Sequence, residues 1–563
     1  ESYYHDFYIG KREITWRMLA DEIDLPRSEW SRANESEIRK KLSVGGHTVL
    51  KKYYEPGLGG TTYIHRLAFD LHGDYPTVLV HNYIYDNTAK AIRKLYDCCK
   101  LPMLILIDGN KVSEDNVMQL QHELGNENFS FCIVYICRNS NGKTGDLILG
   151  RLKNRECNQL REKLLKYIPE NANGQEQLQR LDACIAKPEG DEEHTPFILS
   201  MYAFNREFYG IRNFIKNTLK EIANHELSSK FKKILFALAL ADWAIPDVPA
   251  EYFDSAFLSN ESRLMCNPDY PIAPLIANNM DERQSPLTFR IRYHLYSDEI
   301  LRIASGSGDY ISFLRLRDPI IEFIKSARPN PNIVANRSIV DLLTKMFVSR
   351  AVNIDGNNAK YSRLIERLVS EVKSYLSDNV DTTSDMVVAV LRQLVETFPE
   401  EAHFWGHLAR YYFYSRHDYA SGFEAIDTGL KAAKENNELG LASLYHMKGM
   451  GYVVYITHEL LGSLYSLTKK EPSESLPEIR KLVSEMPDKI AQACMYFQKT
   501  RKANPDDIHA HVAECKMRIN IQTNYFNLLS KYAAEYSIEA LYPIDEVNVN
   551  LDQIDCLIED AKS

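Results

Sequence analysis

Four runs of apolar residues, separated by helical patterns, place the strongest constraint on how the first part of this chain can fold. The runs cover residues 47–54, 75–82, 101–107 and 129–137. Helical patterns lie between them at residues 61–72, 87–100 and 113–124. The runs are continuously hydrophobic rather than alternating, which is typical of strands covered on both faces. The sequence therefore predicts an α/β core with a parallel sheet.

Length and composition limit the classes of protein that need to be considered. The 563 residues correspond to about three or four domains of roughly 150 residues each. The 45% apolar and 26% charged residues are ordinary for a globular chain, and the net charge of −10 disfavours wholesale binding to nucleic acid. Ten scattered cysteines fit a reducing compartment, so we expect a cytoplasmic protein. The apolar stretches are too short to span a membrane.

A glycine-rich loop follows the first apolar run directly and precedes an amphipathic helix. Its residues Tyr54-Glu-Pro-Gly-Leu-Gly-Gly-Thr-Thr62 lie where such turns direct backbone amides at phosphate oxygens. The candidate phosphate-binding residues are Gly57, Gly59, Gly60, Thr61 and Thr62. Compared with the pattern G-x-x-x-x-G-K-[ST], Tyr54 replaces the first glycine and Gly60 replaces the lysine. A tight turn that binds nothing is the plain alternative.

The third apolar run ends in Asp108, which suggests a metal site beside the loop. A hydrophobic strand ending in Asp positions magnesium in phosphate-loop folds, so Thr61 and Asp108 are the Mg²⁺ candidates. The plain alternative is an Asp that caps the turn before Gly109. No carboxylate directly follows Asp108 to align an attacking water, and Glu114 is expected in the next helix. Hydrolysis is therefore uncertain, and at most a slow ATPase is expected.

Two residues after the fourth run are candidate sensors of a terminal phosphate. Arg138 and Asn139 follow this strand at the carboxyl edge of the sheet, where open α/β sheets bind ligands. Solvated loop positions are the equal alternative. Lys143 and Arg151 are weaker candidates of the same kind.

Beyond residue 154 the patterns become helical, and a repeat can be counted near the end. Residues 246–308 mix short helices with a β-like run at 288–295, compatible with a winged-helix unit, and every convincing segment from about residue 330 is helical. The register of a tetratricopeptide repeat fits Pro399, Trp405, Leu408, Ala409 and Tyr412, and later Ala493, Phe497 and Pro505. The helix around Gly422 is one residue out of phase. An ordinary helical bundle is the alternative.

These patterns predict five domains in chain order. They are an adaptor segment at residues 1–42, an α/β P-loop NTPase core at 43–153, a helical domain at 154–245, a winged-helix-like domain at 246–325, and tetratricopeptide-like repeats at 326–563.

The loop and its surroundings resemble a known family. The segments Gly59-Gly-Thr-Thr-Tyr-Ile-His-Arg-Leu-Ala-Phe-Asp70, Leu104-Ile-Leu-Ile-Asp108, Phe7-Tyr-Ile-Gly10 and Thr15-Trp16 look like the NTPase region of the sterile alpha motif domain-containing protein 9 family. That family belongs to the STAND class of signal-transduction NTPases, and its loop typically lacks the lysine. The specific motifs lie within residues 1–150.

The resemblance implies an immune or antiviral switch that binds ATP or ADP with Mg²⁺. It implies an effector domain upstream of this chain, a protein partner on the helical repeats, and self-association through the NTPase. STAND proteins commonly carry a winged-helix His that contacts nucleotide, and His294 is the nearest match. The plain alternative is a histidine on a strand face.

The competing hypothesis is a nucleotide-free pseudo-NTPase scaffold for protein assembly, which Gly60 in place of lysine favours. The spacing of His and Cys provides no basis for a structural zinc site, and no nucleophile motif of a hydrolase occurs. The clusters Lys51-Lys52 and Lys230-Phe-Lys-Lys233 leave nucleic-acid binding as a minor alternative, because short basic runs more often mark solvated ends of elements.

Overall fold

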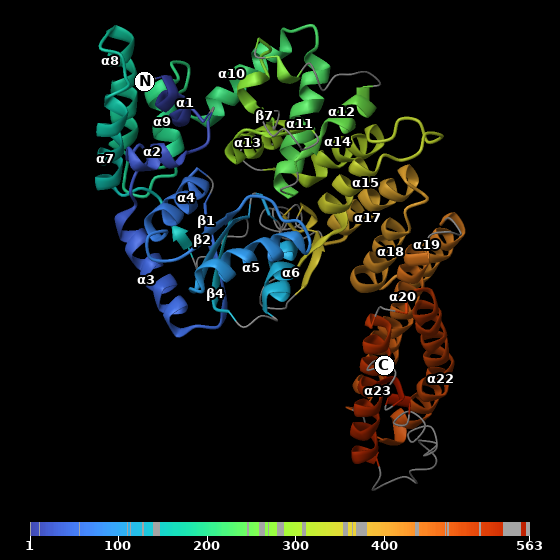
Figure 1. The fold of residues 1–563 in the computed structure, drawn as a ribbon. Coiled ribbons are helices and arrows are strands. Elements are labelled where there is room, and N and C mark those ends of the chain that lie inside the picture. The colour runs from blue at the N-terminus through green and yellow to red at the C-terminus, as the bar shows by residue number, and fades with distance from the viewer. Residues whose placement is uncertain are drawn as a thin grey trace. The chain divides into compact units, whose positions relative to one another are not determined.

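The chain forms two compact units. The structure is a computed structural model that describes residues 2–10, 12–55, 57–109, 111–112, 114–125, 129–138, 147–244, 247–257, 265–267, 269–278, 287–306, 311–352, 358–362, 364–367, 380–433, 438–467, 469, 472–505, 508–532, 553–554 and 556–558. The first unit comprises residues 1–316 and 336–377, and the second comprises 317–335 and 378–563. Figure 1 shows the elements of both units by label.

A parallel sheet forms the centre of the first unit. Its strands are β1 (His47–Tyr54), β2 (Thr77–Val80), β3 (Met103–Asp108), β4 (Phe131–Arg138) and β5 (Leu147–Leu149), in the order β2-β3-β4-β1-β5. All neighbouring strands pair in parallel, with Phe131 of β4 opposite both His47 of β1 and Met103 of β3. The predicted α/β core with a parallel sheet is confirmed, and β4 lies between β1 and β3.

Helices cover both faces of this sheet, which explains its continuously apolar strands. Leu104, Leu106 and Val134 face a core shared with α3 (Ser28–Val44) and α4 (Gly60–Leu71). Ile105 and Ile133 face the opposite core, shared with α5 (Asn87–Cys99) and α6 (Glu114–Gly125). Every residue of β3 is buried. The sheet thus holds its carboxyl edge, where the glycine loop lies, on a rigid frame.

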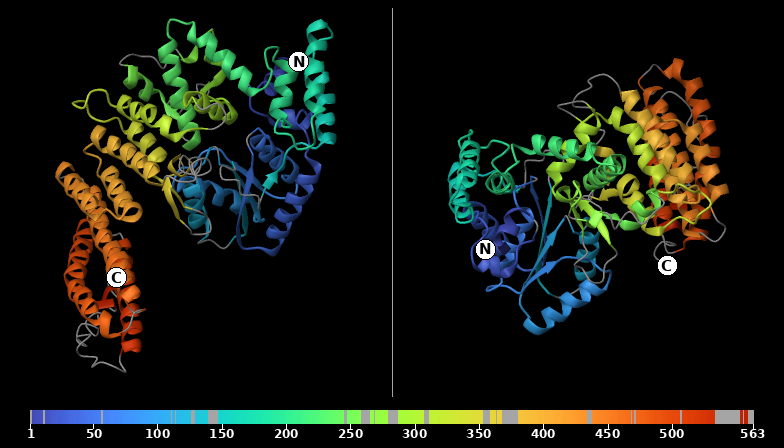
Figure 2. Two further views of the ribbon diagram at one scale, coloured as in Figure 1. Left: turned by 180° about the vertical axis from the view of Figure 1, so that it is seen from behind. Right: turned by 90° about the horizontal axis from the view of Figure 1, so that it is seen from above.

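The N-terminal segment lies beside helices that follow the sheet in sequence. It contains α1 (Ser2–Tyr8), α2 (Trp16–Ala20) and α3, and the next helices are α7 (Asn154–Leu165), α8 (Ala172–Ile185) and α9 (Pro196–Phe204). Tyr8 stacks on Phe204 with 5.7 Å between ring centroids, and both views of Figure 2 keep these blue and teal helices together. The helix α3 adds Ile38 and Leu42 to the sheet core.

A smaller sheet and its helices complete the first unit. Strands β6 (Val248–Pro249), β7 (Ile276–Asn278) and β8 (Thr288–Ile291) form an antiparallel sheet in the order β6-β8-β7. Its neighbours in sequence are α10 (Ile211–Ala223), α11 (Ser228–Ala244), α12 (Ala250–Phe257), the short helix Ala273–Leu275 and α13 (His294–Ala304). This winged-helix-like arrangement agrees with the predicted fold class, although the β-like run at 288–295 ends early. The helix α13 begins at His294 instead. Its residues Tyr296, Ile300 and Leu301 are buried at helical spacing, which favours a helix over a strand here.

One expectation for the later part of the chain is wrong. Besides α14 (Phe313–Ser326), α15 (Arg337–Leu343) and a π-helical turn at Thr344–Val348, the structure has an antiparallel pair of strands, β9 (Arg350–Val352) and β10 (Asn358–Ser362). The region beyond residue 330 is therefore not entirely helical. The strands are only three and five residues long, too short for their own periodicity to stand out.

The second unit is built from helices that pack in sequence order. They are α17 (Val380–Thr397), α18 (Ala402–Tyr411), α19 (Tyr419–Ala432), α20 (Glu438–Tyr455), α21 (Gly462–Leu467), α22 (Pro472–Ala503) and α23 (His509–Tyr532), with π-helical turns at Tyr412–Arg416 and Ile456–Leu461. Trp405 Nε1 donates to Pro399 O at 2.9 Å, and Ala409, Ala493 and Phe497 are fully buried. The predicted helical repeat architecture is confirmed, whereas the exact five-domain division stays a prediction.

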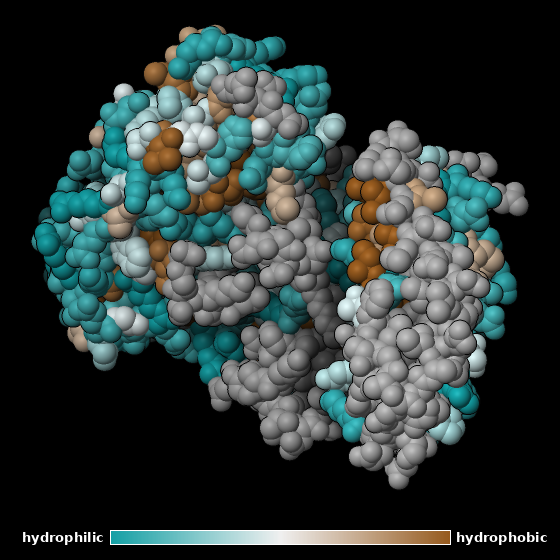
Figure 3. All heavy atoms as spheres, turned by 90° about the horizontal axis from the view of Figure 1, so that it is seen from below, coloured by the Kyte–Doolittle hydropathy of each residue, from teal (hydrophilic) through white to brown (hydrophobic). Residues whose placement is uncertain are grey.

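Hydrophilic side chains cover most of the described surface visible in Figure 3, with small hydrophobic groups between them. Among the residues that the structure describes, no helix is both long and apolar enough to cross a membrane.

Candidate phosphate-binding site

The glycine loop joins β1 to α4 through two left-handed residues. Gly57 has φ +84° and Gly59 has φ +82° with ψ 34°, where Gly59 is the N-cap of α4. Side chains rarely tolerate these angles, so both positions require glycine. Pro56, between them and β1, lies outside the described residues. The loop is thus a true strand-to-helix turn of the kind that the sequence predicts.

The two departures from the P-loop pattern contact each other. A Cβ atom added to Gly60 would lie 2.5 Å from Cε1 and Cζ of Tyr54, whose side chain is buried. No side chain fits at position 60 while the tyrosine ring occupies this place. The tyrosine in place of the first glycine and the glycine in place of lysine are therefore one coupled replacement, which sequence reasoning treated as two.

Backbone amides at the start of α4 provide the donors of the loop. The amide of Tyr63 makes the first bond of the helix, to Gly59 O at 2.8 Å. The amides of Gly60, Thr61 and Thr62 precede it, in the turn where helices have no intrahelical acceptor for N–H groups. Together with the helix dipole, these amides favour an anion at this end of α4.

Thr61 and Asp108 meet across the edge of the sheet. Thr61 Oγ1 donates a hydrogen bond to Asp108 Oδ2 at 2.7 Å, and Asp108 is 5% exposed. These two oxygens come from the first turn of α4 and from the end of β3. Mg²⁺ binds one or two protein oxygens in addition to phosphate and water, so this pair fits the donor set of a magnesium site.

The carboxylate that follows Asp108 in sequence is already engaged. Glu114 begins α6, as the sequence predicts, and its Oε1 lies 2.5 Å from Lys51 Nζ on β1. Burial opposes the charge of Lys51, but the hydrogen bond that Lys51 donates to Glu114 prevails and raises the pKa of the lysine. Glu114 is therefore held by Lys51 in a largely buried ion pair.

A cluster of charged and imidazole groups lies beside the loop. His65 Nδ1 is 2.7 Å from Thr61 O, and the His65 and His81 rings are 5.8 Å apart. Burial first, then Lys111 and His65, lower the pKa of His81. Lys111 follows the end of β3, and its Nζ lies 2.9 Å from Glu13 Oε2. Sequence reasoning missed this cluster, because only the fold brings Glu13 to Lys111.

The structure describes only some of the predicted sensor residues. Arg138 ends β4 opposite Tyr54 of β1, so its backbone lies at the start of the loop. Asn139 and Lys143 lie outside the described residues. Arg151 Nε bonds Glu55 Oε2 of the loop at 3.0 Å. Their roles toward a phosphate stay predictions.

His294 lies on a helix, so the expectation of a strand histidine is wrong. It is the first residue of α13. Its Nδ1 lies 2.5 Å from Asp242 Oδ2 and its Nε2 lies 3.1 Å from Nη1 of Arg367. Both ring nitrogens are thus engaged in a network beside Trp243, over whose ring the Arg367 guanidinium stacks at 3.8 Å. Contact of His294 with a nucleotide stays a prediction.

Other elements of the first unit approach the loop at Gly57. The amide of Phe197 donates to Gly57 O at 3.4 Å. A Cβ atom at Gly57 would lie 3.1 Å from Leu295 Cδ1 and 3.3 Å from Thr195 Oγ1. The start of α9 and the start of α13 therefore both contact the loop, which links it to the helical and winged-helix-like parts.

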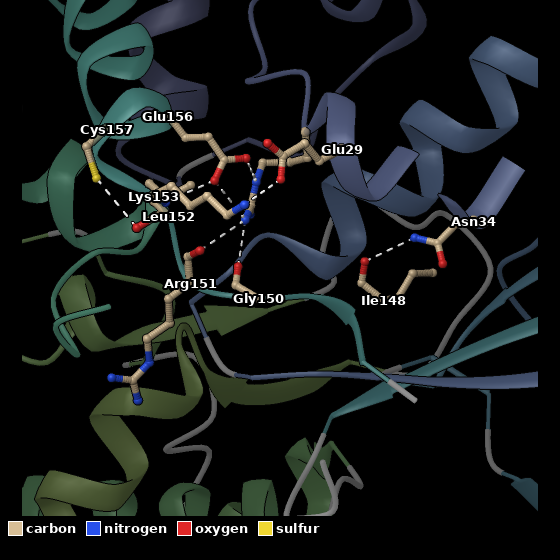
Figure 4. Close-up of polar contacts among 10 residues, drawn as sticks. Glu29, Asn34, Ile148, Gly150, Arg151, Leu152, Lys153, Glu156 and Cys157 are labelled. Atoms are coloured by element: carbon tan, nitrogen blue, oxygen red, sulfur yellow. Dashed lines mark hydrogen bonds and ion pairs between the residues drawn. The ribbon is translucent and has the colours of Figure 1, made fainter. Parts of the chain in front are cut away.

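The adaptor is tied to the sheet edge by a separate set of polar contacts. Arg27 donates to Glu156 Oε1 at 2.7 Å and to Gly150 O at 2.6 Å. Figure 4 shows Asn34 directed at Ile148 O and Lys153 beside Glu29. These contacts fix α3 to β5 and α7.

Comparisons with known proteins add little to this picture. No family model and no curated protein matches the chain. One similar solved structure is a signal transduction ATPase with numerous domains (STAND) protein with a tetratricopeptide repeat sensor, from Pyrococcus horikoshii. It is 13% identical, and the match covers 93% of this chain and 84% of that chain with a TM-score of 0.26. We therefore take the fold from the strand order and the loop described above.

Proposed function

We propose that this chain is the nucleotide-binding regulatory module of a STAND-type signalling protein, which binds ATP or ADP with Mg²⁺ at the glycine loop. The observation that supports this most is the pairing of Thr61 with Asp108 at 2.7 Å beside two left-handed glycines, Gly57 and Gly59. A bound nucleotide would supply phosphate oxygens and Mg²⁺ would supply charge neutralisation. The amides of Gly60, Thr61 and Thr62 would hold the phosphates.

Binding without fast turnover is the expected consequence of this site. The ammonium group that would neutralise the β- and γ-phosphates is absent at Gly60. Glu114 is paired with Lys51 at 2.5 Å, so its carboxylate is engaged elsewhere. We therefore propose at most slow ATP hydrolysis, with the bound nucleotide acting as a regulator.

A switch follows from the contacts at Gly57. Thr195, Phe197 and Leu295 contact this glycine from two later helices. A nucleotide that makes different contacts in an open and a closed arrangement of these elements would shift the population between them. This shift between open and closed arrangements would be transmitted to the helical repeats. Their stacked helices would bind a protein partner.

The resemblance to the sterile alpha motif domain-containing protein 9 family supports the finer proposals. They are an immune or antiviral role, an effector domain outside this chain, self-association through the NTPase, and a cytoplasmic location. All ten cysteines lie among the described residues and none of them forms a disulfide, which fits a reducing compartment.

Isothermal titration calorimetry of the whole chain with ATP and with ADP, each with and without magnesium, tests the proposal. We expect binding that Gly59→Val weakens, because valine is strained at φ +82°. Gly73→Val is the matched control, since an added Cβ meets nothing within 4 Å there. Absence of heat at millimolar nucleotide would contradict nucleotide binding.

The alternative function is a nucleotide-free scaffold. The ring of Tyr54 against Gly60 favours it, because this ring occupies the place of the usual lysine stem. Purified chain can be denatured and its supernatant analysed by ion-exchange chromatography for released nucleotide. A stoichiometric nucleotide would rule out the scaffold, whereas an empty chain that also gives no heat on titration would support it.

A further inference from the structure

A carboxylate of the N-terminal segment lies between two basic side chains at the edge of the sheet. Glu13 Oε2 is 2.9 Å from Lys111 Nζ, and Glu13 Oε1 is 3.9 Å from Nη2 of Arg290 on β8. The Glu13 side chain is 52% exposed and that of Lys111 is 20% exposed. Although partial burial opposes it, the charge of Lys111 lowers the pKa of Glu13, so the carboxylate is ionised.

The base of Lys111 is fixed close to the Thr61–Asp108 pair. The amide of Lys111 donates to Asp108 O at 2.9 Å. The same aspartate accepts from Thr61 Oγ1, and the carbonyl of Thr61 lies 2.7 Å from His65 Nδ1. Glu13 interacts electrostatically with His65. The lysine and its partner thus lie on the side of the loop where phosphates are proposed to bind.

We propose that Lys111 supplies the positive charge that the loop lacks at Gly60, and that Glu13 holds this lysine until a nucleotide phosphate replaces the carboxylate. The inference rests on the proposed function and names the residue that compensates for the coupled Tyr54–Gly60 replacement. Lysine suits this role because its ammonium group is a compact charge on a flexible stem.

The ion pair is weak enough to be exchanged. The Glu13 side chain is half exposed, so water screens its charge and weakens the pair. A phosphate group carries more negative charge than a carboxylate and accepts stronger charge-assisted hydrogen bonds. A nucleotide that takes Lys111 would also release the carboxylate that reaches Arg290.

Release of Glu13 would affect how the N-terminal segment is attached to the winged-helix-like part. Arg292 Nη1 donates to Gly10 O at 3.4 Å, and Tyr293 Oη donates to Ile9 O at 3.1 Å. Residues 9, 10 and 13 of the N-terminal segment therefore all contact the winged-helix-like part. Loss of the Glu13 contact would weaken this connection when phosphate binds.

Calorimetric titration of the whole chain with magnesium ATP tests the inference through a double-mutant cycle. We expect Lys111→Gln to weaken binding about tenfold, the loss of one charge-assisted hydrogen bond. Glu13→Gln should tighten binding about threefold, because the lysine no longer has a competing partner. In the double variant the gain from Glu13→Gln should vanish, and Lys111→Arg should restore much of the affinity.

The pair Glu29–Lys153 provides the matched control. It also joins the adaptor to the core, at 2.5 Å, with side chains that are 69% and 51% exposed. Glu29→Gln and Lys153→Gln should leave the affinity unchanged. Nucleotide binding that is the same in Lys111→Gln as in these controls would overturn the inference and leave the proposed function standing. No binding in any variant, Glu13→Gln included, would overturn both.

Discussion

The glycine loop and the hairpin of α18 and α19 both depart from a known sequence pattern, but in different ways. In the loop, a side chain compensates: the Tyr54 ring fills the space over Gly60, so the turn is kept and the lysine is lost. In the hairpin, the backbone compensates: a π-helical turn absorbs one extra residue, and Gly422 and Gly429 still lie against aromatic rings. The first departure changes the chemistry of a site, whereas the second changes only the spacing of the repeat residues along the sequence.

The extra residue of the hairpin lies in its π-helical turn. A π turn inserts one residue into an α-helix. The turn at Tyr412–Arg416 therefore shifts all later small residues of the repeat by one position. Gly422 meets the ring of Phe413, and a Cβ atom at Gly429 would lie 2.7 Å from Trp405 Cβ. The helix α19 is one residue out of phase in the sequence, but its glycines still pack against the neighbouring helix.

Deleting one residue gives the largest test of this comparison. Deletion of Ser415 within the π turn should be tolerated, because an ordinary α turn would then bring Gly422 into the usual spacing. Deletion of Thr428 in α19 should cost more than about 4 kcal/mol, because Gly429 would rotate away from Trp405 and a larger side chain would replace it. Hydrogen exchange of residues 402–432 measures both. Equal loss of protection would contradict the assignment of the extra residue to the turn.

Adding a methyl group at the two compensating glycines should give intermediate effects. Gly60→Ala and Gly429→Ala each place a Cβ against an aromatic side chain, at 2.5 Å from Tyr54 and 2.7 Å from Trp405. We expect each to cost about 1–3 kcal/mol by overpacking. Scanning calorimetry would report the loss as a lower transition temperature.

Gly73→Ala controls for the substitution itself. Nothing lies within 4 Å of a Cβ atom added there, so its transition temperature should not fall. A Gly60→Ala variant as stable as Gly73→Ala would mean that Tyr54 does not exclude side chains from position 60.

Exchanging both residues of the coupled pair should restore the usual loop chemistry. Tyr54→Gly with Gly60→Lys should bind magnesium ATP about tenfold more tightly than the wild type, because the amine can then reach the phosphates. Gly60→Lys alone should not gain affinity, since the tyrosine ring still occupies the space. Calorimetry on the single and double variants measures how far the effects of positions 54 and 60 on affinity depend on each other. Tighter binding by Gly60→Lys alone would refute this dependence.

The smallest expected effect is at the magnesium pair. Thr61→Val removes the hydroxyl group that bonds Asp108 at 2.7 Å and keeps the shape of the side chain. Binding of ATP should weaken about threefold with magnesium and stay unchanged with EDTA. An equal loss in both buffers would assign Thr61 to the fold rather than to the metal.

The sequence predicted the sheet and the place of the loop because both depend on local patterns. The continuously apolar strands β1 and β3 and the glycines around residue 59 are visible within short windows. The strand β5 was missed because it has only three residues, Leu147–Leu149.

The contacts that give the site its character depend on the fold. Tyr54 contacts Gly60 only because the loop folds the helix start back over the strand end. Glu13 and Lys111 are 98 residues apart in sequence, and no periodicity relates them. The residues of a site that come from separate elements therefore became visible only when the sheet brought them together.

The central claim is that peptide amides of the loop hold phosphate after the usual lysine has been lost. Hydrogen–deuterium exchange with mass spectrometry, on peptides that cover residues 57–64, measures these amides directly. We expect slower exchange there on adding magnesium ATP, and unchanged exchange at the glycine turn of residues 43–46, which joins α3 to β1. Saturating nucleotide that leaves residues 57–64 exchanging as fast as before would contradict it.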